Sequence, residues 1–250
     1  MKKDIAFFDE LYSKSKIDPW GADWRGTIGV WHDFCLNCIS ESLNKSFTSN
    51  YPITILDIGC GSGILTEMIY SLLSKKYNIK DYLAVDISSK AISRAKSLHP
   101  MSKVNYQTTS EDLSTIQENS FQLILGFGFL PYLTSDKRLQ LFSTLKSIKS
   151  SDGLILLSSN VRVNNEDSNY PLADLIAKEL SVFFSIMNIY KLFLSQYSEG
   201  IEAKLLKLNS VLPLSRLLQQ KYLPKKFNQY YSKKATDIFP DKRLHLYELI

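Results

Sequence analysis

The residues best suited to ligand chemistry lie in the stretch Asp57–Gly63, where an acidic side chain is followed by glycines at positions 59, 61 and 63. A mostly apolar run over 53–58 leads into this stretch and is typical of a buried strand. Glycine at every second position lets the backbone turn tightly with a ligand pressed against it. We expect a helix from about Ile64, whose N-terminal amides would point at that ligand. The stretch therefore predicts the first strand and nucleotide-binding turn of a Rossmann-like sheet.

The glycine spacing also limits which nucleotide could bind. Dinucleotide-binding proteins carry G-x-G-x-x-G/A after this strand, and the position of the third glycine is Ile64 here. Asp57 stands inside the turn, where a carboxylate would repel a pyrophosphate. The spacing disfavours nicotinamide and flavin dinucleotides and indicates a ligand that is cationic near Asp57.

The same stretch resembles the (D/E)-x-G-x-G-x-G signature of class I S-adenosylmethionine-dependent methyltransferases, and other landmarks of that family follow in order. The resemblance covers roughly Asp57 to Val161. It implies that Asp86 accepts hydrogen bonds from both ribose hydroxyls and that Asp112 takes the adenine amino group, with Leu113 lending its backbone amide. It also implies that Phe121–Leu133 forms the fourth strand and the loop under the methionine moiety. The implied cofactor is S-adenosylmethionine, the product is S-adenosylhomocysteine, and the expected cofactor-binding residues are Asp57, Gly59, Gly61, Gly63, Asp86, Ile87, Asp112, Leu113, Phe127, Tyr12 and Trp20.

An aromatic N-terminal segment extends this resemblance. Phe7–Tyr12, followed by Asp18–Gly21, resembles the segment that folds over the cofactor in nodulation-type (NodS-like) and related small-molecule N-methyltransferases. Aromatic faces such as those of Tyr12 and Trp20 would attract a cationic sulfonium by about 0.5–2 kcal/mol. For Trp24 and Trp31 we favour a simpler role in packing helices onto the core.

Two missing motifs narrow the methyl acceptor. Enzymes that methylate the exocyclic amines of nucleic-acid bases usually carry (D/N)-P-P-(Y/F) after the fourth strand, whereas residues 126–132 read Gly-Phe-Gly-Phe-Leu-Pro-Tyr. A Pro-Cys pair for pyrimidine C5 methylation is also missing. We therefore expect transfer to a nitrogen or oxygen of a small metabolite, with nucleic acid disfavoured as a partner.

Other functions stay open at this point. From Lys191 onward the sequence has eleven Lys or Arg against five Asp or Glu, which would suit an RNA methyltransferase or only a solvated helical face. A non-catalytic S-adenosylmethionine-binding or assembly protein is a further alternative. A homodimer is compatible with the sequence but is not predicted by it.

A hydroxyl acceptor would profit from a general base, whereas an amine needs only to arrive neutral. His32, His99 and His245 are the candidate bases, and Tyr132 and Tyr197 are candidate hydrogen-bond partners. Of these we single out His32 and Tyr132 as catalytic candidates.

His32 also extends the pair Cys35 and Cys38 to H-x-x-C-x-x-C. Structural zinc sites usually draw a second ligand pair from elsewhere, and the sequence has no second C-x-x-C. Both cysteines fall on the apolar stripe of a predicted helix, so we interpret them as core residues and expect no metal site.

The elements that must position these residues alternate along the chain. Strands are predicted over 53–58, 82–87, 103–107, 121–126 and 153–160, with helices over 64–75, 89–98 and 135–149. Helices over 5–14 and from about 27 precede them, helices over 171–197 and 201–222 follow, and a last strand covers 243–250. This alternation predicts an α/β fold, a Rossmann-like three-layer sandwich around a seven-stranded, mostly parallel sheet.

We divide the chain into an N-terminal helical lid (1–50), a cofactor-binding core (51–161) and a helical substrate-specificity region with the closing strand or strands (162–250). A composition of 44% apolar and 22% charged residues is typical of globular proteins. The apolar stretch 180–194 is too short to span a bilayer, so we expect a buried helix there. Three cysteines and the lack of an apolar leader after Met1 favour a cytoplasmic protein.

Overall fold

The computed structural model describes residues 4–15, 18–20, 27–49, 51–116, 120–161, 171–193 and 243–250. The strands are β1 (Pro52–Ile58), β2 (Asn78–Asp86), β3 (Asn105–Thr108), β4 (Phe121–Phe127), β5 (Lys149–Val161), β6 (Ile186–Phe193) and β7 (Arg243–Leu249). The helices are α1 (Ile5–Lys14), α2 (Thr27–Ser46), α3 (Ile64–Leu73), α4 (Ser89–Leu98), the short 3₁₀ helix η2 (Leu130–Tyr132), α5 (Ser135–Ile148) and α6 (Ala173–Ser181).

The described strands form one seven-stranded sheet in the order β3-β2-β1-β4-β5-β7-β6. Strands β1 to β5 pair in parallel, and β7 runs antiparallel to both β5 and β6. This confirms the predicted fold class. The chain moves outward in opposite directions from β1 and β4, so the carboxyl ends of these two strands flank the point at which such sheets bind ligands.

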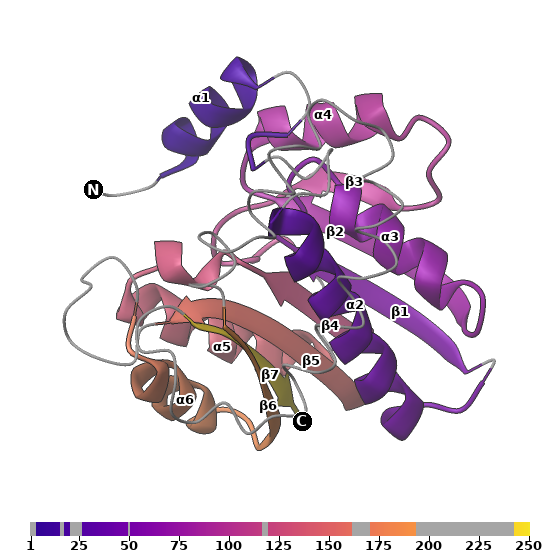
Figure 1. The fold of residues 1–250 in the computed structure, drawn as a ribbon, viewed down its shortest axis with the longest axis vertical. Coiled ribbons are helices and arrows are strands. Elements are labelled where there is room, and N and C mark those ends of the chain that lie inside the picture. The colour runs from indigo at the N-terminus through magenta and orange to yellow at the C-terminus, as the bar shows by residue number, and fades with distance from the viewer. Residues whose placement is uncertain are drawn as a thin grey trace, which may run out of the picture.

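Helices cover both faces of the sheet (Figure 1). Alternate residues of β1 face opposite sides, because side chains along a strand point alternately up and down. Ile53 and Ile55 pack in a buried cluster with residues of α2 and α3, whereas Leu56 and Ile58 pack with residues of α5 and α6. The sheet is thus buried on both faces, as a parallel sheet requires.

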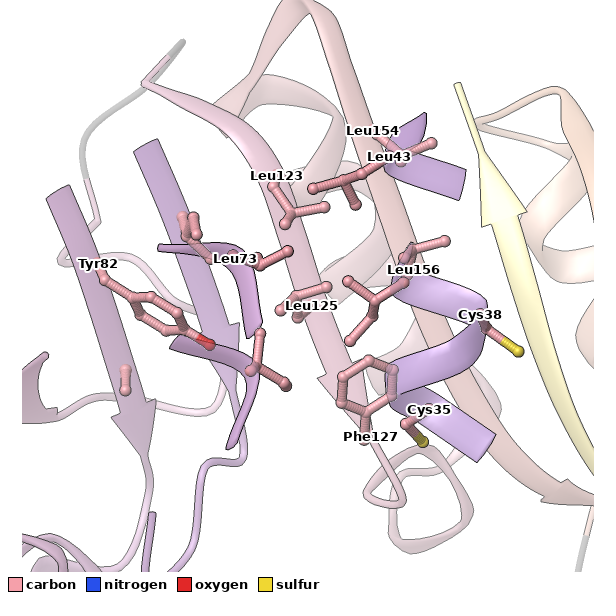
Figure 2. Close-up of a cluster of buried hydrophobic side chains, with 14 of the residues drawn as sticks. Cys35, Cys38, Leu43, Leu73, Tyr82, Leu123, Leu125, Phe127, Leu154 and Leu156 are labelled. Carbon is pink, nitrogen blue, oxygen red and sulfur yellow. The ribbon is translucent and has the colours of Figure 1, made fainter. Parts of the chain in front are cut away.

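Cys35 and Cys38 belong to the first of these clusters. Figure 2 shows both on α2 beside β4 and β5, which carry Phe127 and Leu156. They occupy the packing positions that the apolar stripe predicted.

Helix starts follow the polar residues that can cap them. The side chains of Asp4, Ser88 and Thr134 accept hydrogen bonds from the backbone N–H three residues on, at N···O distances of 3.1, 3.1 and 3.5 Å. Such caps satisfy amides that a helix leaves unpaired at its first turn. Ser88 and Thr134 thereby fix the starts of α4 and α5, which flank the ligand-binding edge of the sheet.

The helix predicted over 171–197 is wrong. Within its described residues, 171–193, helix is confined to 173–181, and Ile186–Phe193 instead forms β6, paired antiparallel with β7. Ser185 and Ile250 exchange two backbone hydrogen bonds of 3.1 Å next to this pairing. Pairing with a distant strand overrides the helical pattern, which sequence periodicity alone does not reveal. The helix predicted over 201–222 lies outside the described residues.

Among the helices that the structure describes, none combines the length and the apolar character needed to cross a membrane.

Candidate active site

A cavity of about 400 Å³ opens at the carboxyl ends of β1, β2, β4 and β5. The turn after β1 and the end of β2 form one wall, and residues 127–133 form another. Side chains from α1, the segment 18–20 and α2 also line it. All lining residues in the described part of the chain lie between Phe8 and Asn160.

The glycine turn presents bare backbone to this cavity. The amides of Gly59 and Cys60 donate to the carbonyl of Val85 at 2.8 and 3.1 Å, which anchors the turn to β2. Gly61 has φ +57°, and an added Cβ would lie 2.4 Å from the Tyr12 hydroxyl. A side chain at position 61 would therefore be strained and would collide with the lid.

Asp57 is buried at the end of β1 and lines the cavity. Its Oδ2 accepts hydrogen bonds from the Thr66 hydroxyl at 2.7 Å and the Tyr82 hydroxyl at 3.3 Å. Burial raises the pKa of Asp57 to about 7, although these two hydrogen bonds act in the opposite direction. A cationic group entering the cavity would favour the ionised form of Asp57.

Asp86 ends the neighbouring strand and has two backbone partners. Its Oδ2 accepts from the amide of Gly61 and its Oδ1 from the amide of Ser88, both at 2.9 Å. Burial raises the pKa of Asp86 and outweighs the lowering effect of these hydrogen bonds. Two carboxylates on adjacent strands thus face one cavity together with the glycine turn.

The N-terminal segment is hydrogen-bonded to the turns after β1 and β2. Asp9 Oδ1 accepts from the Ser88 hydroxyl at 2.6 Å and from the amide of Lys90 at 3.2 Å. Asp18 accepts a hydrogen bond from the Ser62 hydroxyl in the glycine turn. We call α1 and residues 18–20 the lid.

Aromatic rings of the lid meet Tyr132, which belongs to η2. The Phe8 ring lies edge-on to Tyr132 with centroids 5.5 Å apart, and the Trp20 ring stacks on it at 6.4 Å and 20°. The Tyr12 hydroxyl lies against Gly61, and burial is the main cause that raises the pKa of Tyr12. This part of the cavity is therefore an aromatic surface beside the two carboxylates.

Of the three histidines, only His32 lines the cavity. It lies on α2, is 2% exposed, and its ring centroid is 5.2 Å from that of Trp31. His99 Nε2 lies 3.2 Å from the carbonyl oxygen of Ser62, outside the cavity wall. His245 is buried in β7, with Nδ1 3.4 Å from the Tyr247 hydroxyl.

Most of the residues predicted from the sequence meet at this cavity. Those on its wall are Tyr12, Trp20, His32, Asp57, Gly59, Gly61, Asp86, Ile87, Leu113, Phe127 and Tyr132. Gly63 and Asp112 are not on the wall. Gly63 is the N-cap of α3, and a Cβ there would lie 2.6 Å from the Tyr106 hydroxyl, so its role is architectural. Tyr197 lies outside the described residues.

The segment after β3 differs from the expectation in detail. Glu111 and Leu113 line the cavity, whereas Asp112 accepts a hydrogen bond from the amide of Ser114 at 3.1 Å. Leu113 has φ +57°, and its amide donates to the carbonyl of Ser110 at 3.2 Å. In this conformation Glu111, rather than Asp112, is the acidic side chain on the wall.

The wall also includes residues that were not among the predicted site residues, and the polar or aromatic ones among them include Asp18, Trp31, Glu111 and Asn160. Trp31 packs against the core as expected, but it also lines the cavity beside His32. Asn160 could have been found from its place near the carboxyl end of a predicted parallel strand, where ligand-binding residues gather.

Comparison with known proteins agrees with this geometry. Residues 55–153 match a protein-family model described as "Methyltransferase domain". Ubiquinone biosynthesis O-methyltransferase of Hydrogenovibrio crunogenus is 29% identical over 160 residues, which are 63% of this chain and 61% of that protein. Malonyl-[acyl-carrier protein] O-methyltransferase of Bacillus anthracis is 28% identical over 120 residues, 48% of this chain and 42% of that protein. The matches thus span about half the length of these curated relatives.

A solved structure extends the likeness to nearly the whole chain. N-methyltransferase NodS from Bradyrhizobium japonicum WM9, in complex with S-adenosyl-L-homocysteine, superposes with a TM-score of 0.62 over 98% of this chain and 97% of its own, at 14% identity. At that identity the likeness shows the fold, and the NodS-like character of the N-terminal segment stays a prediction. The methyltransferase-domain match over residues 55–153, the seven-stranded fold and the ordered acidic and glycine motifs agree with the resemblance to class I S-adenosylmethionine-dependent methyltransferases.

Proposed function

We propose that this chain is an enzyme that binds S-adenosylmethionine and transfers its methyl group to a nitrogen or oxygen of a small-molecule acceptor. One observation carries the proposal. Asp57 and Asp86 lie at the carboxyl ends of adjacent parallel strands and face one cavity of about 400 Å³, with the glycine turn beside them. This volume is within the usual range of roughly 300–1,000 Å³ for small-molecule pockets.

The acidic and aromatic side chains on the cavity wall suit the ribose, ammonium and sulfonium groups of this cofactor. Asp86 is the acceptor for the ribose hydroxyls, and Asp57 offers a carboxylate to the ammonium group of the methionine end. Tyr12, Trp20 and Tyr132 present aromatic faces to a sulfonium, which such faces attract. The cofactor, when bound, supplies the electrophilic methyl group.

The protein contributes mainly by positioning the acceptor. Holding the attacking atom about 3 Å from the methyl carbon and in line with the breaking bond provides much of the rate enhancement. Phe8, Tyr12 and Trp20 of the lid line this part of the cavity. His32 and Tyr132 both line the cavity, and we assign His32 to take the proton of a hydroxyl acceptor and Tyr132 to hydrogen-bond the acceptor.

The described wall also bears on the class of acceptor. Its acidic side chains are Asp18, Asp57, Asp86 and Glu111, of which Glu111 is ion-paired with Lys137 behind the wall, and the wall itself includes no Lys or Arg among the described residues. Such a wall favours neutral or cationic acceptors over polyanionic ones. The similar proteins named above include both O- and N-methyltransferases, so the proposal includes nitrogen and oxygen acceptors.

The proposal is tested by incubating the protein with labelled S-adenosylmethionine and fractionated metabolite pools, followed by mass spectrometry of labelled products. We expect label in a small molecule. Label in an RNA fraction alone would support an RNA methyltransferase instead. Tight cofactor binding with no product in any pool would indicate a non-catalytic cofactor-binding protein.

Asp86→Ala is the matched loss-of-binding variant. It removes the proposed ribose acceptor, so cofactor affinity should fall by about a hundredfold or more, as expected for two hydrogen bonds to a charged group. Asp81→Ala, at an exposed carboxylate on the same strand, should bind the cofactor as the wild type does. Near-normal affinity of Asp86→Ala in calorimetric titrations would contradict the assignment.

A further inference from the structure

A buried ion pair lies next to the cavity without lining it. Arg138 in α5 and Glu179 in α6 are 4% and 5% exposed. Arg138 Nε donates to Glu179 Oε2 at 2.6 Å, and Nη2 donates to Oε1 at 2.8 Å. The Ser135 hydroxyl donates to the same carboxylate. Burial raises the pKa of Glu179, but the hydrogen bonds from Arg138 and Ser135 outweigh it, so the net pKa is lowered and the carboxylate is ionised at neutral pH.

The third nitrogen of the Arg138 guanidinium, Nη1, contacts a residue of the cavity wall. Arg138 Nη1 donates to the carbonyl of Leu133 at 2.6 Å. Leu133 is the residue after η2, and its amide donates to the carbonyl of Leu130 at 3.2 Å. The amide of Tyr132 donates to the carbonyl of Phe129 at 3.0 Å. The turn 129–133 contributes Phe129, Tyr132 and Leu133 to the cavity, so the ion pair holds one end of a lining segment.

General stability does not explain why a charged pair is used here. Arg138 lies in the first turn of α5, where the helix dipole disfavours a cation. Removing charges from water is costly, and well-packed apolar residues often stabilise a fold as well as a buried ion pair does. What the planar guanidinium adds is a fixed geometry, because it binds the Glu179 carboxylate bidentately and the Leu133 carbonyl at the same time.

We propose that Arg138 and Glu179 are positioning residues of the active site, which hold the 129–133 turn so that Tyr132 contacts the bound cofactor. No residue of α6 lines the cavity, so α6 affects the cavity wall through the ion pair of Glu179 with Arg138. The inference rests on the proposed function, because the ligand it concerns is the cofactor.

The test is a double-mutant cycle on the affinity for S-adenosylhomocysteine, measured by calorimetry. Glu179→Gln keeps the shape of the side chain and removes its charge, and we expect it to weaken binding about tenfold. Tyr132→Ala removes the ring through which the pair is proposed to act. The double variant should then bind no more weakly than Tyr132→Ala alone, because coupled residues give non-additive effects. Effects of the two changes that simply multiply would overturn the proposal.

A second buried network supplies the control for general destabilisation. The Tyr190 hydroxyl donates to Glu248 Oε2 at 3.0 Å and lies 3.3 Å from the Ser42 hydroxyl, and none of these residues lines the cavity. Tyr190→Phe should lower the melting temperature but leave the affinity for S-adenosylhomocysteine within about twofold of the wild type. Equal loss of affinity in Tyr190→Phe and Glu179→Gln would contradict a positioning role.

Ser135→Ala is the milder variant should Glu179→Gln not fold. It removes one hydrogen bond to Glu179 and keeps the ion pair, so binding should weaken about threefold, and this loss should again vanish in the Tyr132→Ala background. If the loss persists there, the proposal fails. If the wild type does not bind S-adenosylhomocysteine, the proposed function itself fails, which separates the two outcomes.

Discussion

Stability of the ligand-free fold and binding of a cation favour different protonation states of Asp57. Its pKa of about 7 lies well above the value of about 3.9 for an exposed aspartate. Because the folded-state pKa is raised, the contribution of Asp57 to stability is full below about pH 4 and is lost as the pH rises to about 7. Above that pH, the ionised carboxylate costs the ligand-free fold roughly 4 kcal/mol. A bound cation would offset this cost.

Asp57→Asn should therefore stabilise the ligand-free protein at pH 8 and weaken cofactor binding in the same buffer. The amide oxygen can still accept from Thr66 and Tyr82, so packing is retained. Thermal unfolding at pH 8 and at pH 4.5 measures the first effect, and the gain should fall to about a quarter at the lower pH. Titration with S-adenosylhomocysteine at pH 8 measures the second, with a loss of at least about tenfold. A gain in stability that is the same at both pH values would show that Asp57 does not titrate in this range.

At the residue scale, the sequence predicted wall residues well where a strand ends and poorly where a loop continues. Asp57 and Asp86 were predictable because parallel strands bring their carboxyl ends to one edge of the sheet. The choice between Glu111 and Asp112 was not, because a loop has no periodicity that fixes which side chain faces inward. The left-handed conformation of Leu113, at φ +57°, is not encoded by a glycine and gives no local signal.

At the element scale, the lid is attached to the turns that form the cofactor site. Asp9 contacts Ser88 and Lys90, two and four residues after Asp86, and Asp18 contacts Ser62 between Gly61 and Gly63. Arg94 adds a hydrogen bond of 3.2 Å to the carbonyl of Tyr12. Movement of the whole lid, α1 and residues 18–20, away from the core must break these contacts. Lid opening and cofactor release are therefore expected to be linked.

Asp9→Asn and Asp18→Asn should each raise the rate at which S-adenosylhomocysteine dissociates, by about three- to tenfold, because each weakens a charge-assisted hydrogen bond. Displacement by excess S-adenosylmethionine in a stopped-flow instrument, followed by tryptophan fluorescence, measures this rate. Glu10→Gln is the matched control, because Glu10 lies on the same helix and its carboxylate pairs with Lys14 in an exposed contact. Wild-type dissociation rates in both aspartate variants would rule out the lid as a barrier to release.

The elements themselves were predictable to the extent that their patterns are local. Buried apolar runs identified β1, β4 and β5 correctly, and polar caps located the starts of α4 and α5. The stretch 186–193 was misassigned because its strand conformation depends on pairing with β7, more than 50 residues further along the chain. The sequence pattern of one segment gives no information about the distant strand with which that segment pairs.

At the scale of the whole molecule, the described cavity wall belongs to the first 161 residues. β6 and β7 extend the sheet, and α6 reaches the wall only through the ion pair of Glu179 with Arg138. The division into an N-terminal helical lid over 1–50 and a cofactor-binding core over 51–161 stays a prediction. The role of 162–250 in acceptor specificity is a separate proposal, which follows from the position of this region after β5.

Exchange of the segment 194–242, between β6 and β7, tests that proposal while keeping α6 and the ion pair intact. The chimera takes the corresponding segment of a class I methyltransferase with a different known acceptor. Because the core residues are unchanged, its affinity for S-adenosylhomocysteine should stay within about threefold of the wild type, and its labelled product should follow the donor of the segment. The reverse chimera serves as the control and should acquire the product of this chain. An unchanged product in both chimeras would assign acceptor choice to the lid and the 129–133 turn, whereas loss of cofactor binding would place the segment within the cofactor-binding core.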